Sequence, residues 1–359
     1  MENNKKPEYI SKADNSIIMP AVALAVVIAL LLVMTLAFFV IARVSGAGDY
    51  DDFDDIHVND GDDDDGDKNE VKSPFKQEIT NFYPTYVDEG LVSLSSAGLN
   101  SPNVALVDVA QNKIIASSKS DKTNIIYPAS MTKVMTLIVV YENLTSQDQL
   151  KHKITLDAEV VDRMVAEQSS GYGFKAGEVL TVEELIHAVI LYSDGVASVT
   201  LANYVAGSEA DFVKLMNAKA TEMGLQNTLF QNCTGLHHKY HYSTCQDMAA
   251  IMMYAMKNPH CANVLTAESF TLGSHFRPDN DNTYTLYNQA LHTSKFTQPG
   301  KVTVTAAKTG WTEDELSGYC LVSYGKNKDG KAFILVTAGA DSTALRNEDT
   351  VKIYDTYAK

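Results

Sequence analysis

Strand-like segments lie near both ends of the folded part of this 359-residue chain, and helix-like segments fill its middle. Two strands are predicted early, over Val104–Ala110 and Lys113–Ser117, and Gln111-Asn112 between them predicts a hairpin. Three more are predicted late, over Val302–Lys308, Tyr319–Tyr324 and Ala332–Gly339. This order predicts an α+β fold. A five-stranded antiparallel sheet, flanked by helices, is assembled from both ends of the chain, and a mostly helical lobe is inserted between the strands.

The middle of the chain carries signals for helix starts. Three segments resemble capping boxes and are each followed by apolar residues at helical spacing: Thr181–Glu184, Ser208–Asp211 and Thr244–Asp247. The last of these opens a methionine-rich helix, Met248–Lys257, whose methionines we interpret as core filler. A final helix is predicted to start near Ser342.

Ser130 and Lys133 stand three residues apart at the start of a strongly apolar segment, Met131–Tyr141. Pro128 suits a first helical turn, because the N–H that it lacks would have no partner there. Residues three apart share a helix face, so both side chains should point the same way. A lysine held at a buried helix is partly desolvated, which lowers its pKa and lets it take a proton from the serine. We therefore predict a nucleophile with its own base.

Residues Ile17–Ala42 contain no charged side chain, and these 26 residues are enough to cross the hydrocarbon core of a membrane. Lysines precede the stretch and an acidic tract follows it, so the positive-inside rule places the N-terminus in the cytoplasm. We predict a cytoplasmic tail over residues 1–16 and a single transmembrane helix over residues 17–43. A signal peptide cleaved near Ser45-Gly46-Ala47 is the alternative, and it exports the same domain.

Residues 49–70 carry a net charge of −11 out of the −16 of the whole chain. Such a tract cannot bury a core, so we predict an acidic disordered tether over residues 44–85 and a folded catalytic domain over residues 86–359. The rest of the chain sums to only −5, and the folded part has no basic face, so nucleic acid is not an expected partner.

No residue pattern predicts a metal or cofactor site. Asp60, Asp62 and Asp64 have alternate spacing, but the glycine and distal glutamate of an EF-hand loop are out of register. The four cysteines show no C-x-x-C spacing, so zinc is not expected. The sequence leaves open whether these cysteines form disulfides or are buried free thiols: Cys233, Cys245, Cys261 and Cys320.

Three short motifs follow one another along the chain: Ser130-Met-Thr-Lys133, Ser193-Asp194-Gly195 and Lys308-Thr309-Gly310. They resemble the S-x-x-K, S-x-N and K-T-G motifs of penicillin-recognising serine enzymes. With their flanking residues, such as Tyr127-Pro-Ala and Trp311-Thr312, they resemble D-alanyl-D-alanine carboxypeptidases of the low-molecular-weight penicillin-binding type. The similarity runs from about residue 85 to residue 357.

This resemblance implies a fold like that of β-lactamases and transpeptidases. It also implies a bacterial cell-wall hydrolase outside the cell membrane that acts on peptidoglycan stem peptides, is acylated by β-lactams and uses no cofactor. The N-terminal helix would replace the C-terminal amphipathic anchor of many relatives.

The resemblance also assigns roles in the reaction. Ser130 attacks the carbonyl between two D-alanines and forms an acyl-enzyme, with Lys133 as the base. Ser193 relays a proton towards the leaving amine. Lys308 supplies a second positive charge that helps to keep Lys133 neutral.

Substrate binding falls to the third motif and the residue after it. Lys308 and Thr309 bind the terminal carboxylate, and Gly310 lets the substrate backbone approach the strand closely. The backbone N–H groups of Ser130 and Trp311 form the oxyanion hole. Trp311, the single tryptophan, is expected either to cover the substrate or simply to pack.

The second motif departs from the family pattern, because Gly195 stands where the family has asparagine. The amide that contacts the substrate peptide and orients the lysine is missing, and Asp194 offers only an oxygen acceptor. Losing one buried polar contact costs about 1–3 kcal/mol, roughly tenfold to a hundredfold in rate. An altered substrate, or a weak or inactive homologue that only binds peptidoglycan or β-lactam, therefore remains an alternative.

A serine β-lactamase is a nearer rival, since Ser193-Asp194 matches its Ser-Asp-Asn motif well. However, no E-x-x-L-N-type segment that would activate a deacylating water follows Ser193. Among the histidines, His187 is predicted to be a core residue and His241 to make a structural hydrogen bond. His237 remains a lesser candidate.

Overall fold

A computed structural model of the chain describes residues 72–118, 125–277, 283–292, 301–313 and 318–359. The predicted cytoplasmic tail and transmembrane helix, and the predicted tether up to residue 71, lie outside these residues. Within the described ranges, no helix is both long enough and apolar enough to cross a membrane.

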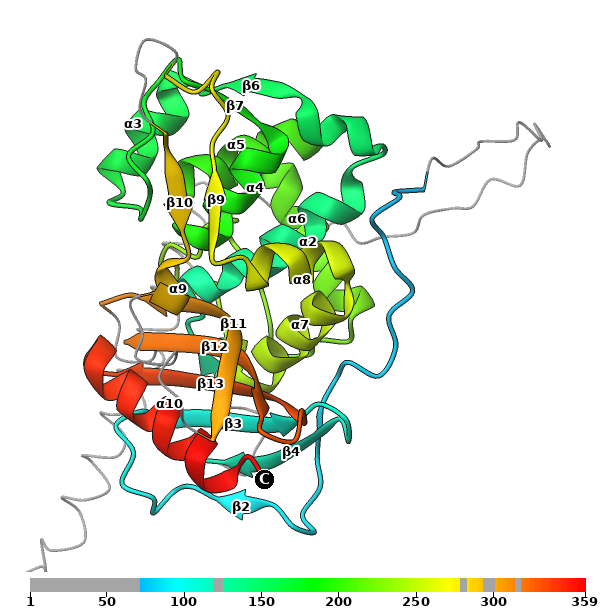
Figure 1. Cartoon of the computed structure of the whole chain (residues 1–359), viewed down its shortest axis with the longest axis vertical. Helices are drawn as coiled ribbons and strands as arrows, with labels where there is room; N and C mark the ends of the chain where they lie inside the picture. The colour runs from blue at the N-terminus through cyan, green and yellow to red at the C-terminus, as the bar shows by residue number, and fades with distance from the viewer. Residues whose placement is uncertain (1–71, 119–124, 278–282, 293–300, 314–317) are drawn as a thin grey trace, which may run out of the picture. The chain divides into compact units, whose positions relative to one another are not determined.

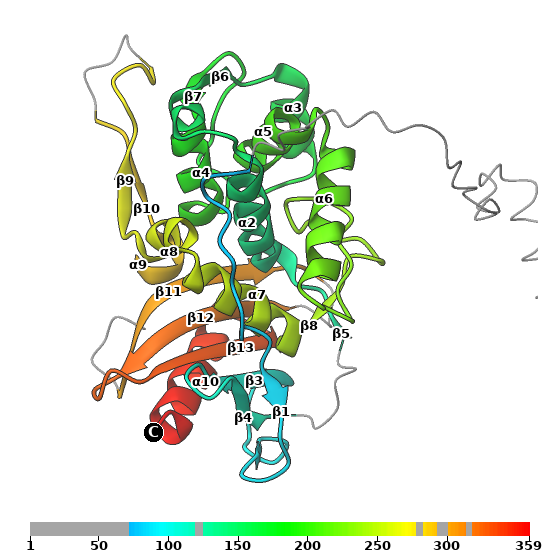
Figure 2. The same cartoon turned by 90° about the vertical axis from the view of Figure 1, so that its right-hand side faces the viewer.

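One sheet is built from both ends of the described chain, in the strand order β1-β4-β3-β13-β12-β11 (Figures 1 and 2). Its five long strands are antiparallel neighbours and match the five predicted ones: β3 (Asn103–Asp108), β4 (Lys113–Ser117), β11 (Val302–Trp311), β12 (Tyr319–Asn327) and β13 (Ala332–Ala340). The early and late halves meet where β3 pairs with β13, with Ala105 opposite Val336.

The prediction of five strands was too low. Two short strands, β1 (Thr85–Tyr86) and β2 (Val92–Ser93), pair in parallel with β4 and raise the number to seven. They lie in the segment that leads into the domain, and they satisfy backbone groups of β4 that would otherwise form an open edge.

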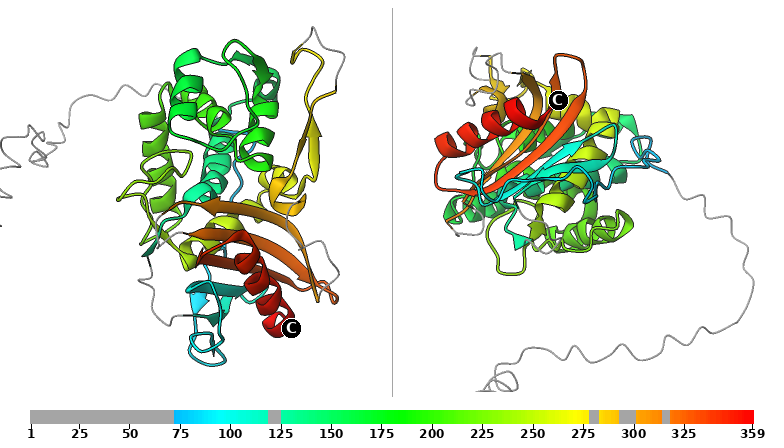
Figure 3. Two further views of the ribbon diagram at one scale, coloured as in Figure 1. Left: turned by 90° about the vertical axis from the view of Figure 1, so that its left-hand side faces the viewer. Right: turned by 90° about the horizontal axis from the view of Figure 1, so that it is seen from below.

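Both faces of the sheet are buried, so the fold has three layers. Along β3, Val104 and Leu106 face one apolar cluster, whereas Ala105 and Val107 face another. Helix α10 (Thr343–Tyr357) covers the first face, and α7 (Cys245–Lys257) packs on the second (Figure 3).

The helical lobe follows the nucleophile motif along the chain. Its helices are α2 (Lys133–Asn143), α3 (Ala158–Ala166), α4 (Val182–Leu191), α5 (Gly195–Ala206), α6 (Glu209–Glu222) and α8 (Pro259–Thr266). The predicted helix starts are confirmed: the side chains of Thr181, Ser208, Thr244 and Ser342 each accept a backbone N–H at the start of a helix.

Short elements link these helices. They are the 3₁₀ turns η1 (Ala129–Thr132) and η2 (Gln147–Lys151), the pairs β5 (Ile125–Ile126) with β8 (Ser243–Thr244) and β6 (Lys153–Thr155) with β7 (Val179–Thr181), and helix α9 (Gln289–His292). A further hairpin, β9 (Ser269–Thr271) with β10 (Thr285–Tyr287), lies beside α4 (Figure 2).

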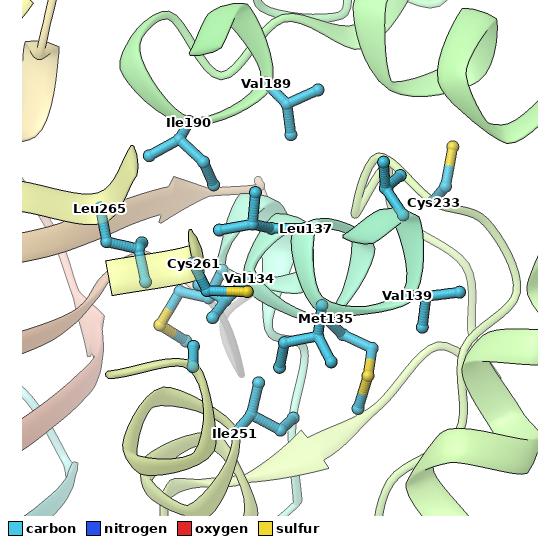
Figure 4. Close-up of a cluster of buried hydrophobic side chains, with 14 of the residues drawn as sticks. Val134, Met135, Leu137, Val139, Val189, Ile190, Cys233, Ile251, Cys261 and Leu265 are labelled. Carbon is cyan, nitrogen blue, oxygen red and sulfur yellow. The ribbon is translucent and has the colours of Figure 1, made fainter. Parts of the chain in front are cut away.

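Helix α2 is surrounded by apolar side chains. Leu137 on α2 lies among residues from three other helices, including Ile190 of α4, Ile251 of α7 and Leu265 of α8 (Figure 4). Burial of each such side chain contributes about 1.5–3 kcal/mol, so this helix is rigidly held. The first turn of α2 therefore offers a fixed platform for a reactive side chain.

The folded domain begins earlier than the predicted boundary at residue 86. Phe75 is only 1% exposed and packs against the rings of Tyr141 and His260. Ser73 Oγ donates a hydrogen bond to the carbonyl of Tyr141 at 2.9 Å, and Asn258 Nδ2 donates to the carbonyl of Phe75 at 3.0 Å. The acidic tract ends before these apolar side chains, so residues 72–85 pack on the domain instead of continuing the tether.

Candidate active site

Residues from all three motifs line one cavity of about 440 Å³: Ser130, Ser193, Thr309 and Gly310, followed by Trp311. A second cavity of about 630 Å³ is also lined by Ser130 and Trp311, and additionally by Lys133. The two cavities thus meet at the predicted nucleophile, which leaves room for a substrate on both sides of it.

Ser130 lies in the 3₁₀ turn η1, directly before Lys133 opens α2. The sequence predicted a helix that already includes Met131, so the prediction was wrong about this first turn. Ala129 has a φ of +46°, an unfavourable conformation for a residue with a side chain, and this turn aims Ser130 into the cavity. The strained turn is supported by the packed helix behind it.

Lys133 is in hydrogen-bond reach of the predicted nucleophile. Its Nζ lies 3.1 Å from Ser130 Oγ and donates to the carbonyl of Thr234 at 2.5 Å. The side chain is only 1% exposed, and burial lowers the pKa of Lys133 to about 8, although the nearby Cys233 and Asp194 act in the opposite direction. A substantial fraction of Lys133 is therefore neutral near pH 8 and able to accept the serine proton.

His241 supports the 3₁₀ turn η1 through a hydrogen bond to Thr132. Its Nδ1 accepts the backbone N–H of Gln231 at 3.2 Å, so its Nε2 carries the proton and donates to Thr132 Oγ1 at 2.8 Å. Burial lowers the pKa of His241 to about 3, which keeps the ring neutral. The predicted structural role is confirmed.

The other two histidines differ in position. His187 is buried in the core, stacked on Phe270 with ring centroids 3.8 Å apart, as predicted. His237 lines the second cavity, and its ring lies nearly perpendicular to that of Tyr127, with centroids 4.8 Å apart.

Ser193 lies in the short link between α4 and α5 and has a φ of +57°. Its Oγ accepts a hydrogen bond from Lys308 Nζ at 2.9 Å. Asp194 beside it is buried, and its carboxylate accepts the N–H groups of Ala197 (2.8 Å) and Tyr172 (2.7 Å). The Asp194 carboxylate, the oxygen acceptor predicted from the sequence, thus caps α5 and holds the loop that contains Tyr172.

Lys308, the first residue of the third motif, is buried on β11. Burial lowers the pKa of Lys308 well below its ordinary value, and repulsion from Lys133 acts in the same direction. β11 is the last strand in the described sheet order, so its far edge faces the cleft and can pair with an extended peptide.

Gly310 brings β11 close to the nucleophile turn. A Cβ at this position would lie 2.6 Å from Cys320 Sγ and 2.9 Å from Ala129 Cβ. Glycine is therefore needed at residue 310 for β11 to pack against the turn η1. This is a second reason for glycine, besides the predicted close approach of the substrate backbone. Trp311 is 52% exposed and lies against Tyr319, so it forms part of the cleft wall and is not a core residue.

Some cavity residues had no signal in the sequence. Tyr192, Gln289 and Arg346 line the first cavity, and Arg346, a residue only 3% exposed, supplies a guanidinium there. Arg346 Nη2 donates to Asn347 Oδ1 at 2.8 Å on the same helix, α10. Its position depends on the packing of α10 against the sheet, which local sequence does not specify.

The four cysteines are all buried and none is joined in a disulfide: Cys233, Cys245, Cys261 and Cys320. In the part of the chain that the structure describes, no group of three or more His, Cys, Asp or Glu side chains is placed to hold a metal ion. The two cavities and their hydrogen bonds bring together the hydroxyls of Ser130 and Ser193 and the amines of Lys133 and Lys308.

The sequence matches a family described as D-alanyl-D-alanine carboxypeptidase over residues 92–342. It is 32% identical to D-alanyl-D-alanine carboxypeptidase DacF of Bacillus subtilis (strain 168) over 253 residues, 70% of this chain and 61% of DacF. It is 31% identical to DacC, described in the same way, of Escherichia coli (strain K12) over 252 residues, 69% of this chain and 58% of DacC.

Solved structures agree with these matches. The crystal structure of the Streptomyces K15 DD-transpeptidase aligns with a TM-score of 0.61 and 25% identity, covering 71% of this chain and 95% of that one. The chain spans about three fifths of the length of the two curated relatives.

Proposed function

This chain belongs to the D-alanyl-D-alanine carboxypeptidase family, and we propose that it is a serine carboxypeptidase acting through an acyl-enzyme on Ser130. Its substrates would be peptidoglycan stem peptides, from which it removes the terminal D-alanine. The observation that carries the proposal is the contact between Lys133 Nζ and Ser130 Oγ at 3.1 Å, with a lysine whose burial lowers its pKa to about 8.

Acylation would proceed in two steps. Neutral Lys133 takes the Ser130 proton while Oγ attacks the carbonyl between the two D-alanines, and the backbone N–H groups of Ser130 and Trp311 receive the developing negative charge. The C–N bond then breaks, and the proton held by Lys133 passes through Ser193 to the departing amine of D-alanine, which leaves Lys133 neutral again. The hydrogen bond from Lys308 to Ser193 Oγ orients that relay.

Deacylation would reuse the same base. Lys133 removes a proton from water, the water oxygen attacks the ester carbonyl, and Ser130 leaves with a proton returned to Oγ. The acyl part of the substrate would occupy the second cavity, which Lys133 lines together with Ser130.

The terminal carboxylate of the substrate would bind in the first cavity. Thr309 and Arg346 both line it, and Lys308 lies beside them through its hydrogen bond to Ser193. A guanidinium and a hydroxyl are suitable partners for a carboxylate. The exposed edge of β11 would pair with the substrate backbone.

β-Lactams would acylate Ser130 as inhibitors, because they present a reactive carbonyl in place of the peptide bond. We also propose that Ile17–Ala42 anchors the chain in the bacterial cell membrane, with the catalytic domain outside. The uncharged length of that stretch and the lysines before it support this location.

A second candidate is a penicillin-binding homologue with weak or no hydrolytic activity. Gly195 favours it, because the side-chain amide of the second motif is absent. The active enzyme is favoured by two hydrogen-bonded pairs, Lys133 with Ser130 and Lys308 with Ser193.

D-Alanine release by the full chain from a peptide ending in D-Ala-D-Ala tests the proposal, with Ser130→Ala as the control. We expect release from the wild type and none from the variant. Labelling by a fluorescent penicillin runs in parallel. Labelling without release would favour the binding-only candidate, and fast turnover of the penicillin would indicate a β-lactamase.

A further inference from the structure

The space beside Gly195 is filled by another residue. A Cβ added to Gly195 would overlap Ser169 Oγ, and it would lie 2.8 Å from Ser169 Cβ and 3.1 Å from Met164 Sδ. A side chain at residue 195 would therefore begin where the Ser169 side chain now lies. The Ser169 side chain therefore fills the space that an asparagine side chain at residue 195 would need.

Backbone hydrogen bonds hold the Ser169 loop in this position. The N–H of Gly195 donates to the carbonyl of Ser170 at 2.9 Å, and the N–H of Ser169 donates to the carbonyl of Met164 at 2.9 Å. Tyr172 is fixed to Asp194 Oδ2 through its own N–H at 2.7 Å. The loop is thus attached to the start of α5 after Ser169 and to α3 at Ser169 itself, so its approach to Gly195 is a fixed feature of the fold.

Ser169 also faces the reaction centre. It lines the same cavity as Ser130 and Lys133, and its side chain is partly exposed there. Its hydroxyl makes no hydrogen bond to any residue that the structure describes, so it is available to a ligand. A hydroxyl both donates and accepts hydrogen bonds, as an amide does.

We propose that Ser169 replaces the missing asparagine of the second motif and hydrogen-bonds the acyl part of the substrate through Oγ. This inference rests on the proposed function, because it assigns a residue to the same reaction. It makes Ser169 a substrate-binding residue contributed by the loop after α3, and it explains how the chain tolerates Gly195.

Two kinds of variant separate this role from simple space filling. Ser169→Ala keeps the Cβ and the packing but removes the hydroxyl. We expect it to lower kcat/KM for D-alanine release about tenfold, the effect of one lost hydrogen bond, with an unchanged unfolding temperature.

The second comparison moves the polar group back to residue 195. Gly195→Asn alone should lose activity and stability, because the new side chain overlaps Ser169. The double variant Ser169→Gly with Gly195→Asn removes the overlap and restores an amide, so we expect its kcat/KM to exceed those of Gly195→Asn and Ser169→Gly. Acylation by fluorescent penicillin is measured for every variant as a second readout.

The inference fails if Ser169→Ala matches the wild type in both readouts, or if the double variant is no better than Gly195→Asn. Either result leaves the proposed function intact, since the wild type remains active. A wild type that releases no D-alanine but is acylated by penicillin still tests Ser169 through the acylation rate. A wild type that does neither overturns both proposals.

Discussion

Lys308 Nζ donates a hydrogen bond to Ser193 Oγ at 2.9 Å and so joins two motifs that lie 115 residues apart in the sequence. The bond connects the edge strand β11 to the link between α4 and α5, and the lysine side chain that makes it is buried. In the proposed mechanism, proton relay and carboxylate binding therefore both depend on the Lys308 side chain.

Replacing Lys308 with methionine should impair acylation through the lost hydrogen bond to Ser193. We expect the acylation rate to fall about a hundredfold. The pH dependence should stay unchanged, because burial lowers the pKa of Lys133 and the pKa of Lys308 is itself lowered well below its ordinary value. Fluorescent penicillin labelling at several pH values measures both effects, and a pH profile that moves to higher pH would contradict the second.

The wild type should acylate faster as the pH rises. Burial lowers the pKa of Lys133 to about 8, and only its neutral form accepts the serine proton. The rate should therefore increase from pH 6 and level off above about pH 8. Lys133→Arg, which stays charged, should show little acylation at any pH. A flat profile between pH 6 and 9 would rule out Lys133 as the base.

Gly310→Ala should separate the strand from the nucleophile. Its Cβ would crowd both Cys320 Sγ and Ala129 Cβ, so either β11 or the turn that holds Ser130 must shift. We expect at least a tenfold loss of acylation, since small misplacement of reacting groups is costly.

Gly325→Ala is the matched control in the same sheet. Its Cβ would lie 2.6 Å from Val302 Cγ1, away from the cleft, so it should lower stability by about 1–3 kcal/mol without changing the acylation rate of the folded protein. Equal acylation losses in both variants would mean that Gly310 acts only through stability.

Removing one partner of a buried ion pair should destabilise the fold strongly. Lys219 Nζ lies 2.8 Å from Glu142 Oε2, both side chains are about 5% exposed, and Tyr254 donates its hydroxyl to Glu142 Oε1 at 2.6 Å. Lys219→Met should cost about 3–5 kcal/mol of unfolding free energy, because Glu142 is left buried without its cation. Adding Glu142→Gln should recover part of the loss in chemical denaturation; no recovery would show that packing of the lysine, not charge pairing, dominates.

Phe75→Ala tests the early start of the folded domain. Removing this buried ring should cost about 3–5 kcal/mol in urea unfolding. Phe53, in the acidic tract, is the comparison, and Phe53→Ala should have no effect if that tract is a tether. A neutral result at Phe75 would return the boundary to the predicted residue 86.

The sequence predicted the parts of the fold that local patterns control. The five long strands follow from alternating or fully apolar runs, and the helix starts follow from capping residues such as Thr181 and Ser342. The short parallel strands β1 and β2 escaped prediction, because two residues carry too little pattern to identify a strand.

The sequence predicted the motif residues of the site but not every residue that lines it. Ser130, Lys133, Ser193 and Lys308 have motif spacing, and the structure brings them together. Ser169 and Arg346 belong to no motif, and their positions depend on how a loop and a distant helix pack. The positive φ of Ser193 also follows from the tight link between two helices, which spacing alone does not reveal.

The pairing of β3 with β13 has a consequence for the order of folding. Ala105 and Val336, which lie opposite each other, are separated by most of the domain, and contacts between such distant residues form late and slowly. A growing chain can build the helices that hold Ser130 long before β11 and β13 exist. The cleft therefore has only one wall until the last strands are made, and a partly synthesised chain carries the nucleophile without the means to use it.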